Sequence, residues 1–137
     1  MALIVWNDAL SVKVDEIDVQ HQQLVALINQ LHDAMSQGKG REVIGSVLAG
    51  LLEYTRTHFA AEERMMVAGS YPGYPVQRAA HEALIQQVVD LRTRFLTGET
   101  VMTQEVMKFL KDWLMEHIRV LDMQLGVYLN NKAGAHA

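Results

Sequence analysis

The sequence predicts an all-α protein, built as an up-down-up-down antiparallel four-helix bundle with an extended N-terminal arm. The chain has 137 residues, half of them apolar and about a fifth charged, as in one globular domain. Apolar residues recur at spacings of three and four in four long segments. Short stretches rich in helix breakers separate these segments, and short connections favour antiparallel neighbours.

Residues 1–17 show no clear helical period, so we expect an extended arm that packs on the bundle with Trp6 as its anchor. Residues 18–130 then form the bundle. The small-residue tail, 131–137, is expected to fray.

The four predicted helices each carry an apolar stripe, and they span residues 18–37, 41–67, 75–96 and 103–130. Glycines end the first helix, and a loop with glycines and prolines ends the second. Pro75 suits the first turn of the third helix. Gly126 is a candidate for an early end of the last helix.

Composition excludes several classes of function. The net charge of -4 and the lack of a basic cluster argue against nucleic-acid binding. Without cysteine, no disulfide, thiolate metal site or thiol nucleophile is possible. The apolar stretch at the N-terminus ends at Asn7 and Asp8, so it is too short for a secretory signal. No apolar run approaches the roughly 18 residues of a membrane span. We therefore expect a cytoplasmic protein with no membrane partner.

Polar residues occupy faces that otherwise belong to the core. His58 and Glu62 lie four residues apart, so both point to one side of the second helix. In an antiparallel bundle the start of one helix lies beside the end of the next, which brings seven such residues to one end. They are His21, His58, Glu62, Gln77, His81, His117 and Asp122. Buried charges at this density need each other or a cation.

Two further histidines lie away from this set and are not expected to bind a metal ion. His32 lies on nearly the same face as His21 but about 16 Å further along the helix axis, so we expect no metal ligand there. His136 lies in the tail and carries no structural signal.

Imidazoles with two carboxylates suit iron, manganese or zinc. Six or seven ligands are too many for one ion with an open position. Two ions bridged by Glu62 and Asp122 would use them all and leave room for a small ligand. A ferritin-like centre needs Glu-x-x-His on two helices, and no glutamate here has a histidine three residues later.

The polar motifs resemble those of the hemerythrin family, in particular its single-domain bacterial members, the bacteriohemerythrins, from about Trp6 to Leu129. The matching pieces are Ile17-Asp18-x-Gln20-His21, His58-Phe59-x-x-Glu62-Glu63, His81, Trp113-Leu114-x-x-His117-Ile118 and Asp122.

The resemblance implies two non-haem iron ions with an oxo or hydroxo bridge and reversible binding of O2. By the family pattern, His21 and His58 serve the iron that binds O2, and His81 and His117 serve the other. Glu62 and Asp122 would bridge the two. The resemblance also implies an apolar O2 pocket, formed by Leu24, Phe59, Trp113, Leu114 and Ile118.

One departure from the family pattern concerns Gln77, which stands where the family has a histidine ligand. An amide oxygen is a weaker iron ligand than imidazole. Three outcomes stay open: Gln77 binds through oxygen, water replaces it, or that iron is lost or loosely held. After Asp122, Met123-Gln124-Leu125 stands where the family usually has a lysine and an aromatic residue.

We therefore expect an O2-binding protein for storage, transport or delivery rather than an enzyme, since no catalytic group beyond the ligands is evident. The sequence carries no signalling domain, which favours carrying over sensing. Two alternatives remain open at this point. One is peroxidase, oxidase or nitric oxide chemistry at a centre altered by Gln77, and the other is an iron-poor structural or interaction bundle.

Overall fold

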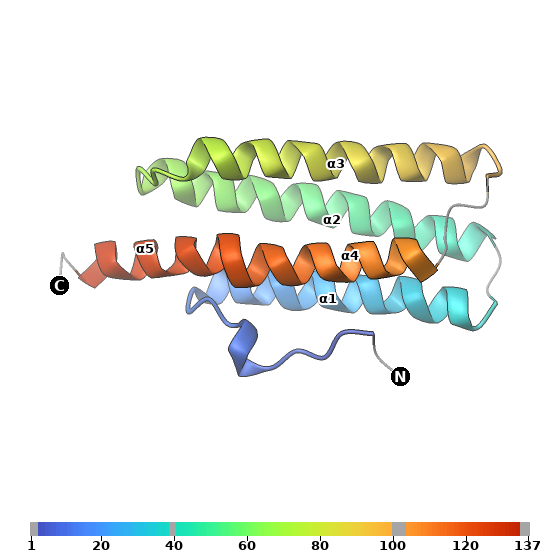
Figure 1. Ribbon diagram of the computed structural model, residues 1–137, viewed down its shortest axis with the longest axis horizontal. Helices are drawn as coiled ribbons and strands as arrows, with labels where there is room; N and C mark the ends of the chain where they lie inside the picture. The colour runs from blue at the N-terminus through green and yellow to red at the C-terminus, as the bar shows by residue number, and fades with distance from the viewer. Residues whose placement is uncertain (1–2, 39–40, 100–103, 135–137) are drawn as a thin grey trace.

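The computed structural model describes residues 3–38, 41–99 and 104–134. Four long helical rods lie side by side and alternate in direction, which confirms the predicted four-helix bundle (Figure 1). The first three rods are α1 (Asp15–Ser36), α2 (Arg41–Ala68) and α3 (Tyr74–Leu96). The fourth consists of α4 (Gln104–Glu116), a π-helical segment η2 (His117–Asp122) and α5 (Met123–Gly134).

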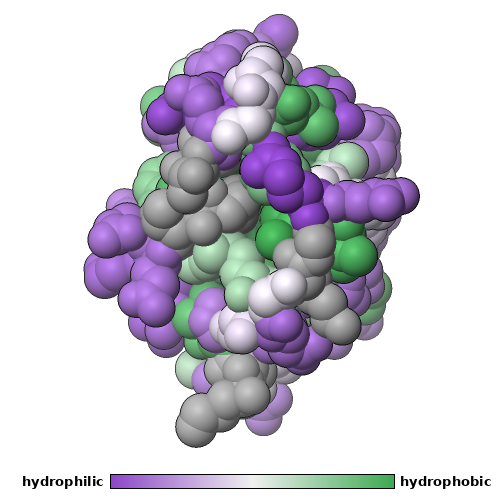
Figure 2. Space-filling view, turned by 90° about the vertical axis from the view of Figure 1, so that its right-hand side faces the viewer, coloured by the Kyte–Doolittle hydropathy of each residue, from purple (hydrophilic) through white to green (hydrophobic). Residues whose placement is uncertain are grey.

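The rods pack through their apolar stripes, with α1 against α2 and α4, and α2 against α3. The end of the bundle that carries the α1–α2 and α3–α4 connections is seen in Figure 2, where hydrophilic side chains surround smaller hydrophobic areas. Among the described helices, none combines the length and apolar character that a membrane span requires.

The helix α1 begins at Asp15, three residues before its predicted start. Acidic side chains in its first turn, including Asp18, favour a helix N-terminus because they complement the helix dipole. The Asp18 carboxylate also accepts hydrogen bonds from Ser11 Oγ (2.6 Å) and from the Val12 backbone N–H (2.8 Å). The arm is thereby tied to the first turn of α1.

The N-terminal arm packs on the bundle, but its anchoring differs from the prediction. Trp6 stays partly exposed against the core, whereas Ile4, Leu10 and Val12 are buried. Leu10 is positioned by a short 3-10 turn, η1 (Asp8–Leu10), so the arm is not extended throughout. Branched aliphatic side chains are more often completely buried than a bulky indole, which is rarely enclosed on all sides.

Gly126 does not end the last helix, because α5 continues through it to Gly134. A Cβ atom at Gly126 would overlap the carbonyl of Val12, so glycine allows the arm to lie directly against α5. Asn130 adds a hydrogen bond from Nδ2 to the Lys13 carbonyl (3.1 Å). The first part of the predicted tail is thus helical, and residues 135–137, with His136, lie outside the described part of the chain.

Gly126→Ala should lower the free energy of unfolding by about 1–3 kcal/mol, because the new methyl group forces the arm away from α5. Gly50 provides the matched control, since it is an exposed glycine inside α2 with nothing near its Cβ position. Gly50→Ala should raise stability by up to about 1 kcal/mol through helix propensity. Urea denaturation of the two variants measures both effects, and a stabilising Gly126→Ala would contradict the close approach.

Candidate metal centre

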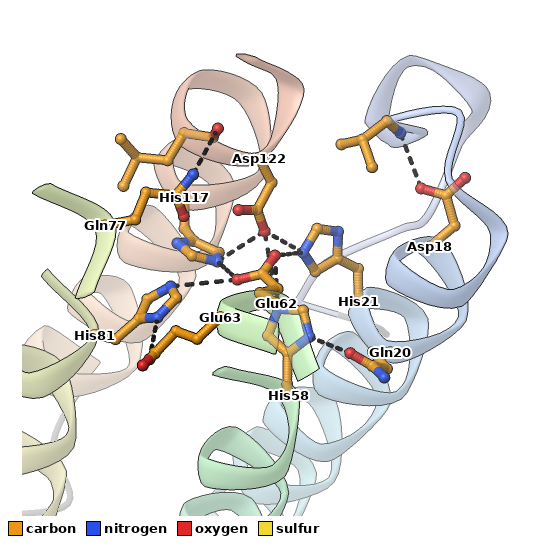
Figure 3. A network of polar contacts seen from close by, with 12 residues as sticks. Asp18, Gln20, His21, His58, Glu62, Glu63, Gln77, His81, His117 and Asp122 are labelled. Atoms are coloured by element: carbon orange, nitrogen blue, oxygen red, sulfur yellow. Dashed lines mark hydrogen bonds and ion pairs between the residues drawn. The ribbon is translucent and has the colours of Figure 1, made fainter. Parts of the chain in front are cut away.

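Six titratable side chains from all four rods meet in the interior of the bundle (Figure 3). They are His21 from α1, His58 and Glu62 from α2, His81 from α3, and His117 and Asp122 from η2. Each is at most 2% exposed. The structure therefore brings together all six titratable residues among the seven that the sequence placed at one end of the bundle.

The carboxylate of Glu62 lies between two pairs of histidines. Its Oε1 is 3.2 Å from both His81 Nε2 and His117 Nε2. Its Oε2 is 3.4 Å from His58 Nε2 and 3.8 Å from His21 Nε2. The two oxygens of a single carboxylate thus face two different imidazole pairs.

Asp122 joins the same two pairs from the opposite side of the cluster. Its Oδ2 lies 2.7 Å from His21 Nε2 and 2.8 Å from His117 Nε2. Its Oδ1 is buried and has no hydrogen-bond partner among the residues that the structure describes. Both carboxylates therefore occupy the space between the histidine pairs.

Two of the imidazoles are oriented by hydrogen bonds at their other ring nitrogen. His58 Nδ1 lies 2.7 Å from Gln20 Oε1, and His81 Nδ1 lies 3.0 Å from Glu63 Oε2. Because these oxygens are acceptors, each Nδ1 donates a hydrogen bond to its partner, and Nε2 is the ring nitrogen that faces the carboxylates and that a metal ion would use. The sequence motifs included Gln20 and Glu63, but their role in orienting imidazoles was not predicted. Each lies directly beside a predicted metal ligand in the sequence, and this adjacency was the signal that could have indicated the role.

The π-helical segment explains how His117 and Asp122 face the same way. Five residues along an α-helix turn the side-chain direction by about 140°, which would separate them. In a π-helix, hydrogen bonds run from residue i to i+5, so residues five apart lie nearly one above the other. The segment η2 spans these two residues from end to end. The five-residue spacing was the sequence signal for this π segment, which was not predicted.

Aromatic rings cover the second pair of histidines. Phe59 stacks on His81 with 3.8 Å between ring centroids and 3° between planes. Trp113 stacks on His117 at 4.8 Å and 13°. These rings exclude water from the cluster and fix the imidazole planes.

The charges of the cluster are strongly coupled. Burial alone would raise the pKa of Glu62, but a hydrogen bond from Asp122 and the charge of His117 hold that pKa well below its usual range. Burial alone would lower the pKa of His117, but Asp122 and Glu62 raise it to about 10. The pKa of His58 is raised in the same way, because the attraction of Glu62 and Asp122 exceeds the effect of burial. Without a metal, protonated His117 therefore balances carboxylate charge at neutral pH.

The cluster fits metal ions by its donor atoms. The ligand atoms of His21, His58, Glu62, His117 and Asp122 all lie within 4.8 Å of one another, and His81 adjoins Glu62. Several of these buried atoms lack a hydrogen-bond partner within the described part of the chain, including His58 Nε2, His81 Nε2 and Glu62 Oε2. Unpartnered buried polar atoms are costly, and imidazole with carboxylate is a donor set that iron accepts.

Gln77 lies one turn before His81 on α3 and is 2% exposed. Its Nε2 donates a hydrogen bond to the carbonyl of Leu121 in η2 (3.1 Å), as Figure 3 shows. Its Oε1 is buried without a hydrogen-bond partner among the described residues. Gln77 therefore belongs to the cluster by position, with an oxygen rather than a nitrogen left for any metal.

An apolar cavity of about 20 Å³ lies one helical turn from the histidines of α1 and η2. Leu24, Trp113 and Leu114, three of the five predicted pocket residues, line it. Phe59 and Ile118 do not line it, although both are buried. Thr55 also lines the cavity, and its hydroxyl already donates to the Leu51 carbonyl (2.7 Å). The space is apolar and suits one very small molecule.

His32 lies outside the cluster, as predicted. It is partly buried in α1 and lines a surface groove together with Lys108 and Asp112 of α4. The histidine cluster is therefore specific to one level of the bundle.

Comparison with known proteins gives one consistent result. Residues 12–128 match the family model described as the hemerythrin HHE cation binding domain. The bacteriohemerythrin of Stenotrophomonas maltophilia is 36% identical over 99% of this chain and 90% of its own length. That of Pseudomonas aeruginosa is 41% identical over 87% of this chain and 76% of its own. The myohemerythrin of Sipunculus nudus is 30% identical over 88% of each chain.

The fold is also similar to a crystal structure of wild-type hemerythrin. The TM-score is 0.88 at 33% sequence identity, and the match covers 93% of this chain and 98% of the other.

Metal uptake by the metal-free protein should release protons at pH 7. The raised pKa of about 10 keeps His117 protonated at that pH, and a metal ligand must be deprotonated, so His117 contributes about one proton per chain. A pH indicator in weak buffer measures the release during anaerobic addition of ferrous iron. His32→Gln should release the same amount, because His32 lies outside the cluster. Uptake without proton release would contradict this charge state.

Proposed function

The chain belongs to the hemerythrin family, and we propose that the buried histidine and carboxylate cluster is the centre at which this non-haem di-iron protein binds O2 reversibly. The observation that carries the proposal is the placement of Glu62, whose two oxygens face separate pairs of imidazoles. A carboxylate in that position suits a bridge between two metal ions.

We propose that His21 and His58 would hold one iron and that His81 and His117 would hold the other. Glu62 and Asp122 would bind both, and an oxo or hydroxo bridge would complete the cofactor. The division follows the two faces of the Glu62 carboxylate and the contacts of Asp122 Oδ2 with both sides. When bound, two ferrous ions supply the electrons that reversible O2 binding requires. Gln20 and Glu63 hold His58 and His81 with Nε2 directed at the ions.

The side chains around the centre favour reversible O2 binding because they exclude water and contribute no additional proton donors. We propose that Leu24, Phe59, Trp113, Leu114 and Ile118 form the O2 pocket. Apart from Trp113, which is partly buried, these side chains are at most 2% exposed. An apolar wall offers no proton, so O2 leaves as it arrived. The small cavity beside Leu24 and Leu114 supports this assignment.

We infer a role in O2 storage or delivery, in the cytoplasm, with no nucleic acid or membrane as partner. The relatives carry the names bacteriohemerythrin and myohemerythrin, which supports an O2-binding role for this chain. One observation favours a second candidate. Gln77 puts an amide where an imidazole is expected, which would suit peroxidase or oxidase turnover at the altered iron. Cell fractionation tests the location, and steady-state turnover assays test the enzymatic alternative.

Anaerobic loading with ferrous iron should give about two irons per chain. Exposure to O2 should produce visible absorption bands that vanish on degassing and return with O2. Iron analysis and spectra before and after O2 measure both results, with the metal-free protein as the control. A chain that retains no iron after anaerobic loading would overturn the proposal, and rapid steady consumption of peroxide would favour the enzyme.

Glu62→Ala should lose iron, because the change removes the carboxylate whose two oxygens face the two imidazole pairs. Loss of a ligand-level interaction typically weakens metal affinity by at least roughly 10–100-fold. Glu53→Ala is the matched control, since Glu53 is an exposed glutamate on the same helix. Iron retention after gel filtration compares the two variants. An intact di-iron spectrum in Glu62→Ala would show that the bridge lies elsewhere.

A further inference from the structure

We propose that the side of the centre formed by His81 and His117 has an exchangeable coordination position, held by Gln77 Oε1, that accepts a small anion. This inference rests on the proposed di-iron centre and adds a second binding position to it, apart from the O2 pocket. Gln77 is buried one helical turn from His81, and its side chain offers an amide oxygen in place of an imidazole or a carboxylate.

The position of Gln77 follows from α3. Gln77 and His81 are separated by one helical turn, so their side chains share a face. His81 Nε2 lies 3.2 Å from Glu62 Oε1, which places this face at the second imidazole pair. Gln77 is therefore the next available donor on the same side of the cluster.

The orientation of the Gln77 amide is set by chemistry. The carbonyl oxygen of Leu121 can only accept a hydrogen bond, so the amide atom that lies 3.1 Å from it must be the nitrogen. The other atom, Oε1, is then the one left buried without a partner in the described part of the chain. Because η2 also carries His117 and Asp122, this hydrogen bond ties the amide to the ligand-bearing segment (Figure 3).

The two sides of the centre differ in the strength of their donors. Both sides contain two imidazoles and share the oxygens of Glu62 and Asp122. The side of His81 and His117 adds only a neutral amide oxygen, which suits iron less well than imidazole does. Within the set, the bond from Gln77 is therefore the weakest and the first to exchange.

The charge of the site selects an anion. Two oxidised iron ions carry more positive charge than the two carboxylates and an oxo or hydroxo bridge remove, and the amide of Gln77 adds no negative charge. A buried site with excess positive charge favours a small anion over a neutral ligand.

Azide titration of the oxidised, iron-loaded protein tests the number of positions. Iron analysis first establishes two irons per chain, and calorimetry with visible spectra then counts the bound azide. The native chain should bind about two azides per chain, and Gln77→His about one, because imidazole closes the second position. Gln87→His is the matched control on an exposed face of the same helix and should bind two. One azide per chain in the native protein would overturn the proposal.

Release of iron to a chelator provides a readout that does not depend on ligand binding. The native protein should lose iron in two phases, with one iron leaving roughly tenfold faster than the other. Gln77→His should show one slow phase. Gln77→Leu removes Oε1 and should accelerate the fast phase further, and an unchanged rate would show that Oε1 is no donor. Thermal unfolding of the metal-free variants confirms that each is folded.

The outcomes separate this inference from the proposed function. The proposed function stands if the protein holds two irons and binds O2 reversibly. The inference is overturned if that same protein binds a single azide and releases its iron in a single phase. A native chain that keeps only one iron also overturns it, because the position would be lost rather than exchangeable. If Gln77→His also fails to hold two irons, the proposed function fails and the inference fails with it.

Discussion

Two buried carboxylates set between four imidazoles are the constraint on which the rest of the structure depends. Glu62 and Asp122 carry charge into a bundle core where an uncompensated charge would cost several kcal/mol. Each of the four rods contributes at least one imidazole or carboxylate to the compensation. The cluster therefore links all four rods, and a metal ion bound there would replace the proton that His117 otherwise carries.

The π segment shows how local backbone geometry serves this constraint. An unbroken α-helix would turn Asp122 away from His117, and the cluster would lose one of its two carboxylates. The wider turn of η2 aligns the two side chains, and its Leu121 carbonyl also anchors the amide of Gln77. One irregular segment thus sets the relative positions of His117 and Asp122 and the orientation of the Gln77 amide.

The same apolar side chains act as core and as pocket wall. Leu24 and Leu114 are buried in the bundle interior and also line the small cavity one turn from the histidines. Phe59 and Trp113 stack on His81 and His117 and keep water from them. The bundle thus surrounds its polar centre with apolar side chains, and a very small molecule can be accommodated beside that centre.

The sequence by itself determined the bundle and the level at which its histidines meet. Helical period places a residue on a face, and antiparallel order places the start of one helix beside the end of the next. Only the tertiary structure decided which Glu62 oxygen faces which imidazole pair, how the arm passes Gly126, and where the Gln77 amide points. These features depend on contacts of a few ångströms between residues far apart in the chain, which periodicity does not specify.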